Sequence, residues 1–309
     1  MMNRQVKLAR RPVGLPQRAD FRIEDAPAGE PGPGEVRVVM EVVSLDPAMR
    51  GWMSDAPNYA PPIAIGGVMR GYGAGRVDVS NHPDFEPGDA VVGAVGIQSV
   101  AVARGDQLLK VDTTKAPLAR WIGGLGMTGR TAYFGTLDIL KPTAGETMVV
   151  SAAAGSVGSI VGQICKMQGA RVVGIAGGHD KCRHVVDVLG FDACVDYKAG
   201  HLARDLLAAC PDGIDGDFEN VGGDILDTVM AQMNVNGRIV ICGLIAAYSA
   251  NEPPPGPRNM RAILTRRLTI RGMVVSDWRE RFGEANAALA DWYAAGKLKL
   301  REDKPAYVV

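Results

Sequence analysis

The sequence has no excess of charge of either sign, only four histidines and no long apolar segment. Lys and Arg together number 34, and Asp and Glu together also number 34, so the formal net charge is zero. A chain without net charge has no general attraction to nucleic acid or to anionic lipid. We therefore expect neither nucleic acid nor a membrane as a partner.

Closely spaced cysteines are also missing. No cysteine precedes Cys165, none belongs to a CxxC pair, and no two are closer than Cys182 and Cys194. This spacing argues against structural disulfides and against a zinc ribbon. No continuous apolar block follows the basic N-terminus, so we expect no secretory signal. The most apolar stretch, Met148 to Gly162, is too short to span a bilayer. These features predict a cytoplasmic, reducing location.

What is present indicates a folded globular protein. Hydrophobic residues make up 47% of the chain and charged residues 22%, whereas disordered chains combine low hydrophobicity with high net charge. At roughly 150 residues per domain, the 309 residues are enough for two cores. Glycine accounts for 39 of them, well above its usual ~7% share, so many positions are expected to need a positive φ or a close backbone approach.

The first part of the chain, up to about residue 125, consists of short β-type runs separated by Gly and Pro turn signals. The runs are Val36–Val43, Gly73–Val79, Ala90–Val95, Ser99–Val102 and Leu108–Val111. Short strands at this spacing predict a small all-β domain, a barrel, over residues 1–125.

The second part, residues 126–299, alternates strand and helix patterns after a predicted helix over Leu118–Thr136. The predicted strands are Thr147–Ala152, Arg171–Ala176, Ala193–Asp196, Gly216–Val221, Arg238–Gly243 and Leu268–Val275. The predicted helices are Ser156–Gln168, Asp180–Leu189, Leu202–Ala209, Asp224–Met233 and Arg279–Ala295, and Ala250–Asn259 is predicted to be a rigid loop. Because each right-handed crossover lays a helix across a sheet face, this alternation predicts an α/β fold, a Rossmann doubly wound parallel sheet.

A dinucleotide-binding pattern lies between the first strand and the first helix of this sheet. Ala153, Gly155 and Gly158 match G-x-G-x-x-G with alanine in the first position. Gly155 would let the backbone approach a pyrophosphate at the helix N-terminus, and Gly158 would let the helix pack close to the strand. We therefore expect residues 153–158, including Ser156 and Val157, to bind a cofactor, although a plain tight turn would give the same pattern.

The same segment is one residue away from the G-x-S-x-G motif of α/β-hydrolases. Such a hydrolase needs a histidine late in the chain, after the nucleophile and the acid. The histidines are His82, His179, His184 and His201, and none follows residue 201. The order of residues therefore disfavours a serine hydrolase.

The end of the second strand indicates which dinucleotide is bound. A protein that selects NAD places a carboxylate about 20 residues after the fingerprint, on the ribose 2′-hydroxyl. Here the strand ends in Gly177 and Gly178, which leave room for a 2′-phosphate, and Lys181 can reach that phosphate from the first turn of the next helix. The sequence therefore predicts NADP (NADPH), unless Lys181 is an ordinary solvated lysine and Asp180 merely favours the helix N-terminus.

Several motifs together resemble one family. They are Leu45–Gly51, Val68–Gly71, Gly124–Gly129, the fingerprint, Phe218–Gly223, and Cys242–Ile245 followed by a Pro-rich loop. In these segments the chain resembles the medium-chain dehydrogenase/reductase superfamily, specifically its zinc-independent, NADP-dependent double-bond reductases such as the prostaglandin reductases and leukotriene B4 12-hydroxydehydrogenase.

The resemblance implies an N-terminal GroES-like β-barrel domain and reduction of the C=C bond of enals and enones, with the active site between the domains. It implies that Lys181 and Tyr197 bind the 2′-phosphate and that Asn220 lies by the ribose and nicotinamide. Met127, Thr128, Cys242 and Leu244 should line the rest of the cofactor site. Tyr59 and Tyr248 are candidate catalytic donors to the substrate carbonyl oxygen, or else aromatic walls of the pocket.

Some positions depart from the family pattern. The Gly-His-Glu segment of zinc-dependent relatives corresponds to Gly71-Tyr72-Gly73, so we expect no metal. Ala48, and Thr265 near the expected start of a strand, stand where other members have tyrosine, which puts a tyrosine proton donor in doubt. Residues 300–309 should return to the barrel domain. Relatives continue beyond Val309, so we expect either a truncated chain or a cleft that closes differently.

The sequence thus predicts an NADPH-dependent alkenal or enone reductase. Two alternatives stay open: an NADPH quinone reductase of the same superfamily and a non-catalytic NADPH-binding protein. The strand Leu268–Val275 would lie at a sheet edge, which is able to pair with another chain. We expect a homodimer through that edge.

Overall fold

The structure is a computed structural model that describes residues 1–252 and 254–303. The chain divides into two compact units, Met1–Gly123 together with Glu302 and Asp303, and Gly124–Arg301. In the part of the chain that the structure describes, no helix combines the length and the apolar character needed to cross a membrane.

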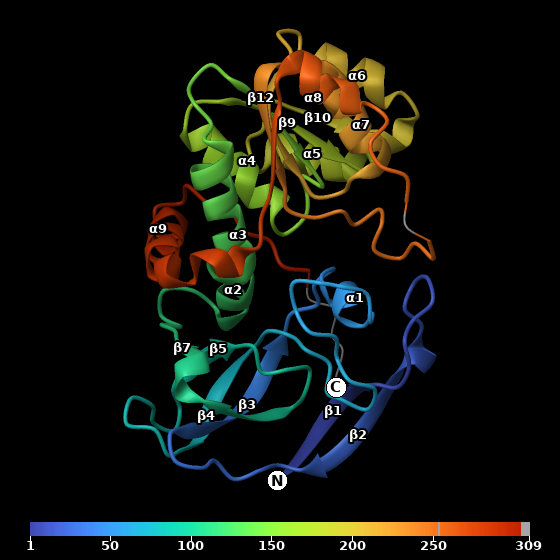
Figure 1. Cartoon of the computed structure of the whole chain (residues 1–309). Helices are drawn as coiled ribbons and strands as arrows, with labels where there is room; N and C mark the ends of the chain where they lie inside the picture. Colours follow the sequence, from blue (N-terminus) through green and yellow to red (C-terminus); the bar gives the residue numbers. More distant parts are fainter. Residues whose placement is uncertain (253, 304–309) are drawn as a thin grey trace. The chain divides into compact units, whose positions relative to one another are not determined.

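The first unit is built on a five-stranded antiparallel sheet in the order β6-β3-β4-β5-β7 (Figure 1). The strands of this unit are β1 (Met2–Leu8), β2 (Phe21–Pro27), β3 (Glu35–Val43), β4 (Gly73–Ser80), β5 (Ala90–Gly93), β6 (Val100–Arg104) and β7 (Leu108–Lys110). Its helices are α1 (Met49–Trp52) and α2 (Leu118–Ile122), with single 3-10 turns η1 (Arg18–Asp20) and η2 (Gly105–Gln107). The curled antiparallel sheet confirms the predicted β domain.

Sequence reasoning missed the two-stranded ribbon of β1 and β2, which pair antiparallel. These strands carry charged side chains rather than an apolar alternation. Charge pairs join them across the ribbon, with Arg4 Nε 2.8 Å from Asp25 Oδ1 and Lys7 Nζ 2.8 Å from Glu24 Oε2. Cross-strand pairs of opposite charge stabilise such a ribbon without giving it a hydrophobic period.

The second unit contains a six-stranded sheet in the order β10-β9-β8-β11-β12-β13, and every neighbouring pair is parallel. The strands are β8 (Thr147–Ser151), β9 (Arg171–Ala176), β10 (Ala193–Asp196), β11 (Ile214–Glu219), β12 (Met233–Ile241) and β13 (Thr269–Gly272). This strand order confirms the predicted doubly wound sheet. The chain runs outward from β8 in one direction and from β11 in the other, so the order of strands reverses between these two.

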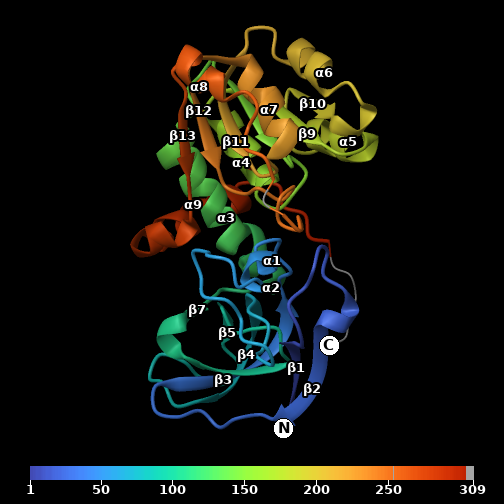
Figure 2. The same ribbon diagram turned by 45° about the vertical axis from the view of Figure 1, so that its right-hand side comes forward.

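Helices cover both faces of this sheet. The helices of this unit are α3 (Thr128–Phe134), α4 (Gly158–Met167), α5 (His179–Asp187), α6 (Leu202–Ala209), α7 (Gly223–Gln232), α8 (Met260–Arg266) and α9 (Phe282–Ala294), of which α9 packs against α3 and η6. Two π-helical segments are η3 (Gly123–Met127) and η4 (Gly135–Leu140), and two 3-10 segments are η5 (Tyr197–Ala199) and η6 (Val275–Arg281). The helices α6, α7 and α8 pack in a row along one face, as Figure 2 shows. Helix α4 buries Ile160, Val161 and Ile164 at helical spacing, as the sequence predicts.

The structure corrects three predictions. The helix expected over Leu118–Thr136 is broken at Gly126, where φ is −116° and ψ is −129°, because the Gly-rich segment imposes little helical preference. The last strand is only Thr269–Gly272, since the apolar residues after it lead into η6. Thr265 lies inside α8, a helix that was not predicted, and not at the start of a strand. Pro253 of the predicted loop and residues 304–309 lie outside the described residues.

Candidate cofactor-binding site

The carboxyl ends of β8 and β11 form the point where the strand order reverses. In open parallel sheets a ligand binds in the crevice outside the carboxyl ends of the strands at this point. Ser151 ends β8 and Glu219 ends β11, and both are fully buried. A ligand site is therefore expected at the segments that follow β8 and β11.

The turn after β8 brings the backbone of the fingerprint close to α4. Ala152 has a φ of 49°, and the N–H of Gly155 donates to the carbonyl of Ala152 over 2.8 Å. A Cβ added at Gly155 would lie 3.0 Å from that oxygen, and one at Gly158 only 2.5 Å from it. Gly158 is thus required by close packing of the helix on the strand. The turn leaves Ser156 exposed at the start of α4, where the N–H groups of Ser159 and Val161 donate to the carbonyls of Gly155 and Val157 over 3.0 Å and point toward the N-terminal end of the helix.

The ends of β9 and β10 bring Gly177, Lys181 and Tyr197 into one region. A Cβ at Gly177 would lie 2.8 Å from the ring of Tyr197, so only glycine lets the ring lie against this backbone. Asp196 accepts hydrogen bonds from the N–H groups of Gly178 at 2.8 Å and of Lys198 at 2.9 Å. These two bonds hold the pKa of the Asp196 carboxyl below its usual range.

Both side chains expected at the 2′-phosphate are accessible. Lys181 is exposed in the first turn of α5, and the Tyr197 side chain, which follows β10, is 43% exposed. An exposed ammonium group and a phenol beside a glycine backbone are suitable donors to a phosphate.

Asn220 follows β11 and is held by Ser151. The Asn220 amide Nδ2 donates to the Ser151 carbonyl over 2.8 Å, and the backbone N–H of Asn220 donates to Ser151 Oγ over 2.7 Å. Ser151 Oγ in turn donates to Glu219 Oε1 over 2.6 Å. The same Glu219 oxygen accepts from the N–H of Val221 and, at 2.9 Å, from that of Gly222. Ser151 and Glu219 therefore position Asn220, and sequence reasoning missed both. Their only signal is a polar side chain at the end of an otherwise apolar strand.

A second buried carboxyl group, that of Asp217, lies on β11 two residues before Glu219. Asp217 is fully buried, and neither of its carboxyl oxygens has a hydrogen-bond partner in the described structure. The register places it level with Val149 and Ile239, which belong to an apolar core. Burial, followed by the charge of Glu219, raises the pKa of Asp217 well above its usual value. Burial also raises the pKa of Glu219.

The segment after β12 is hydrogen-bonded to the carboxyl end of β11. The N–H groups of Cys242 and Gly243 donate to the Glu219 carbonyl over 2.9 and 3.1 Å. Burial raises the pKa of the Cys242 thiol to about 12, so this thiol is neutral at physiological pH and is no nucleophile. The N–H of Leu244 donates to Tyr248 Oη over 3.3 Å. Tyr248 and the residues after β12 thus belong to the neighbourhood of Asn220.

Thr128, at the start of α3, has a buried hydroxyl Oγ1 without a hydrogen-bond partner among the described residues. The preceding carbonyl, that of Met127, accepts from Thr131 Oγ1 over 2.9 Å. Buried hydroxyl groups in native proteins almost always have a partner, and an absent ligand is one explanation when they lack it. The orphaned Thr128 hydroxyl and the close-packed turn at Gly158 both fit a bound dinucleotide.

Tyr59 belongs to the other unit. It lies in the segment after α1, is 60% exposed, and its backbone N–H donates to Asn58 Oδ1 over 2.7 Å. Among the described residues, no group of three or more His, Cys, Asp or Glu side chains is arranged to hold a metal.

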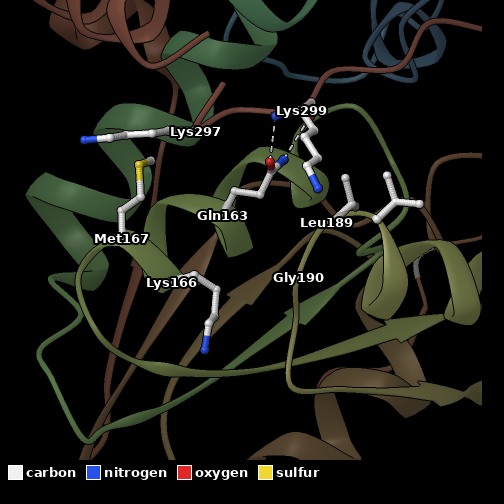
Figure 3. A pocket seen from close by; sticks show the side chains of 8 residues that line it. Gln163, Lys166, Met167, Leu189, Gly190, Lys297 and Lys299 are labelled. Carbon is white, nitrogen blue, oxygen red and sulfur yellow. Dashed lines mark hydrogen bonds between the residues drawn. The ribbon is translucent and has the colours of Figure 1, made fainter. Parts of the chain in front are cut away.

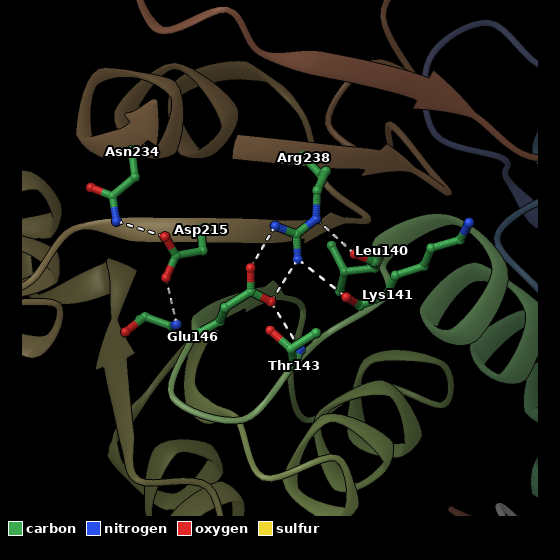
Figure 4. Close-up of polar contacts among 8 residues, drawn as sticks. Leu140, Lys141, Thr143, Glu146, Asp215, Asn234 and Arg238 are labelled. Carbon is green, nitrogen blue, oxygen red and sulfur yellow. Dashed lines mark hydrogen bonds and ion pairs between the residues drawn. The ribbon is translucent and has the colours of Figure 1, made fainter. Parts of the chain in front are cut away.

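Two surface hollows of the second unit contain none of the predicted site residues. Figure 3 shows one of about 300 Å³, lined by Lys166, Lys297 and Lys299 around Gln163. Its Gln163 side chain is already bonded to the backbone of Lys299 at 2.7 and 3.0 Å. The other hollow is lined in part by Arg238. The guanidinium of Arg238 donates two hydrogen bonds of 2.8 Å to the Glu146 carboxylate and so links β12 to the loop before β8 (Figure 4).

Comparison with known proteins gives matches along nearly the whole chain. The family described as the N-terminal domain of oxidoreductase matches residues 4–111, and the zinc-binding dehydrogenase family matches residues 156–291. The NADPH-dependent curcumin reductase of Escherichia coli (strain K12) is 45% identical over 306 residues, which are 97% of this chain and 89% of that protein.

A more distant relative and a solved structure give the same picture. The 2-alkenal reductase (NADP(+)-dependent) of Nicotiana tabacum is 36% identical over 310 residues, covering 97% of this chain and 89% of that protein. The crystal structure of CurA in complex with NADPH from Vibrio vulnificus superposes with a TM-score of 0.92 at 43% identity, covering 97% of this chain and 90% of that one.

Proposed function

Because the chain belongs to the medium-chain dehydrogenase/reductase family, we propose that it is an NADPH-dependent reductase of the C=C bond of small α,β-unsaturated aldehydes and ketones. The family resemblance expected from the motifs is thereby confirmed. The observation that carries the proposal is the likeness to a protein solved with NADPH, together with the fit of this chain's own switch point to that cofactor.

The residues at the switch point divide the proposed NADPH site into three parts. The turn 153–158 takes the pyrophosphate, because its backbone N–H groups and the start of α4 favour an anion. Lys181 and Tyr197, beside Gly177, take the 2′-phosphate. Asn220 and Thr128, with the segment around Cys242, take the nicotinamide half. Bound there, NADPH supplies the hydride for reduction.

The chain's own part in the chemistry is to orient the reactants and to stabilise negative charge on the substrate carbonyl oxygen. Tyr248 is the donor that the geometry of the second unit favours. Its Oη accepts from the N–H of Leu244, which leaves the phenolic proton free to point elsewhere. Tyr59 is the second candidate donor, on the exposed segment of the first unit. Either phenol could instead serve as an aromatic wall.

No zinc takes part in the proposed reaction. The segment that holds zinc in metal-dependent relatives through Gly-His-Glu is Gly71-Tyr72-Gly73 in this chain, and no cysteine precedes Cys165. A zinc site needs three or four nitrogen, sulfur or oxygen ligands within tetrahedral reach. The electrophile must therefore be a hydrogen-bond donor.

Steady-state oxidation of NADPH with a panel of enals, enones and quinones tests the reaction. We expect the ratio kcat/KM to be highest for an enal or enone. Higher values for quinones would favour the quinone-reductase alternative, and no turnover with any acceptor, despite binding of NADPH, would favour a non-catalytic NADPH-binding protein.

We also propose a homodimer formed through the edge of the second sheet. The edge strand β13 is short, but Ile270 on it is 37% exposed, and on the preceding helix Met260 and Leu264 are 55% and 79% exposed. An exposed strand edge flanked by apolar side chains suits an isologous contact. Sedimentation at micromolar concentration should give a dimer, and a monomer would refute this assembly. The cytoplasmic location stays a prediction, to be tested by cell fractionation.

A further inference from the structure

The carboxyl group of Glu219, at the end of β11, is fully buried and has no cationic partner among the residues that the structure describes. Its Oε1 accepts hydrogen bonds from Ser151 Oγ over 2.6 Å, from the N–H of Gly222 over 2.9 Å and from the N–H of Val221. Its Oε2 has no hydrogen-bond partner in the described part of the chain. Donors directed at one oxygen in this way favour the ionised carboxylate.

The other buried carboxyl group of β11, that of Asp217, has no such donors. It lies two residues before Glu219, on the same face of the strand, and both of its oxygens lack a partner among the described residues. Burial raises the pKa of both carboxyl groups, but hydrogen bonds oppose this effect only at Glu219, whose charge raises the pKa of Asp217 further. The pair therefore carries one negative charge, and it is on Glu219.

Glu219 lies at the nicotinamide end of the proposed cofactor site. It directly precedes Asn220, whose side-chain amide donates to the carbonyl of Ser151 over 2.8 Å. The N–H groups of Cys242 and Gly243 donate to the backbone carbonyl of Glu219 over 2.9 and 3.1 Å. The carboxylate is thus attached to both segments, after β11 and after β12, that take the nicotinamide half of the cofactor in the proposed function.

We propose that the Glu219 carboxylate selects for the positive charge of the oxidised nicotinamide, so that it tightens the binding of NADP+ relative to that of NADPH. The nicotinamide ring is positively charged in NADP+ and neutral in NADPH, whereas the phosphates and the adenosine are the same. A buried negative charge without a cation beside it attracts the charged ring much more strongly than the neutral one. This inference rests on the proposed function, because it needs the nicotinamide to lie near Asn220.

The charge also bears on the direction of the proposed reaction. Binding and redox state are linked, so the factor by which Glu219 tightens NADP+ relative to NADPH also favours the oxidised form of the bound cofactor. The carboxylate therefore favours reduction of the substrate over the reverse reaction. This role differs from the support that the same carboxyl group gives to Asn220, because it depends on charge and not on hydrogen bonds alone.

Isothermal titration calorimetry of the full chain with NADPH and with NADP+ separates the two roles. In Glu219→Gln the amide oxygen can still accept the hydrogen bonds to Oε1, so Asn220 keeps its support and only the charge is lost. We expect NADP+ affinity to fall about tenfold relative to NADPH affinity, the effect of a unit charge at roughly 10 Å with an effective dielectric constant of about 20. The matched control is Asp217→Asn, at the neutral carboxyl group, which should keep the wild-type ratio of the two affinities.

Two results would overturn the inference while the proposed function stands. One is a Glu219→Gln chain that keeps the wild-type ratio, whether or not both affinities fall, since the carboxyl group would then only support Asn220. The other is an Asp217→Asn chain whose ratio changes as much as that of Glu219→Gln. If Glu219→Gln does not fold, Glu219→Ala takes its place and an unchanged ratio has the same meaning. A wild type that binds neither nucleotide overturns the proposed function and this inference together.

Discussion

The replacement of Gly158 by alanine tests the packing of the fingerprint turn. The added Cβ would lie 2.5 Å from the Ala152 carbonyl oxygen, 3.0 Å from its carbon and 3.1 Å from the Ala153 Cα, and all three are backbone atoms. Real Cβ atoms essentially never approach closer than 3.0 Å, so the turn and α4 must separate by 3.0 − 2.5 = 0.5 Å at least. No flexible side chain can absorb this displacement.

The cost of that displacement can be compared with the gain in helix propensity. Forcing a group into packed backbone costs typically ~1–3 kcal/mol, whereas replacing glycine by alanine in a helix contributes at most ~1 kcal/mol. We therefore expect Gly158→Ala to lower the free energy of unfolding by about 1–2 kcal/mol. Because the same displacement moves the N–H groups of the turn, NADPH affinity should fall by about tenfold or more.

Urea denaturation and NADPH titration by fluorescence measure the two effects. The matched control is Gly283→Ala, at the second residue of α9, where a Cβ would meet nothing within 4 Å. This control should be as stable as the wild type or slightly more stable, with unchanged affinity. If Gly158→Ala behaves like the control in both measurements, the close approach of α4 to β8 is wrong.

Three further predictions concern buried or paired side chains. The pKa of Asp217 is raised in the folded state, so its contribution to stability is fully present below the ordinary pKa of Asp and is lost as pH rises toward the raised value. In urea unfolding followed from pH 4 to 8, Asp217→Asn should therefore flatten the decline of stability with pH. An unchanged slope would contradict the raised pKa of Asp217. Tyr248→Phe should lower kcat about a hundredfold, with NADPH affinity unchanged, if the phenol is a donor, whereas a change in KM alone would make it a wall of the pocket. Arg238→Ala leaves Glu146 and the carbonyls of Leu140 and Lys141 without their donor, so it should lower the free energy of unfolding by about 1–3 kcal/mol, and a value within error of the wild type would refute that role.

The second unit could be predicted from sequence because its strands are buried and its helices amphipathic. Val149 and Val173 lie in continuous apolar runs, and Ile160 and Ile164 recur at helical spacing, so period and burial agree. The ribbon of β1 and β2 could not be found in this way, since charged side chains interrupt the apolar residues Val6, Leu8 and Phe21, which pack in an apolar cluster.

Part of the candidate site could also be predicted. Gly155 and Gly158 predict a close approach between the turn after β8 and the start of α4, and the structure has this close approach. The network of Ser151 and Glu219 is not visible in the sequence, because it depends on β8 and β11 being neighbours although 62 residues separate Ser151 from Ile214 at the start of β11. Only the strand order brings Ser151 to Glu219 and to Asn220, which follows Glu219 in the sequence.

The most direct test of the account is a fluorescence titration of NADPH and of NADH against the wild type and Lys181→Ala. We predict that the wild type binds NADPH more tightly than NADH. The variant should lose about ten- to a hundredfold in NADPH affinity, the value of a hydrogen bond to a charged group, while its affinity for NADH stays the same. Equal affinity of the wild type for the two dinucleotides, or a variant that binds NADPH as the wild type does, would contradict the account.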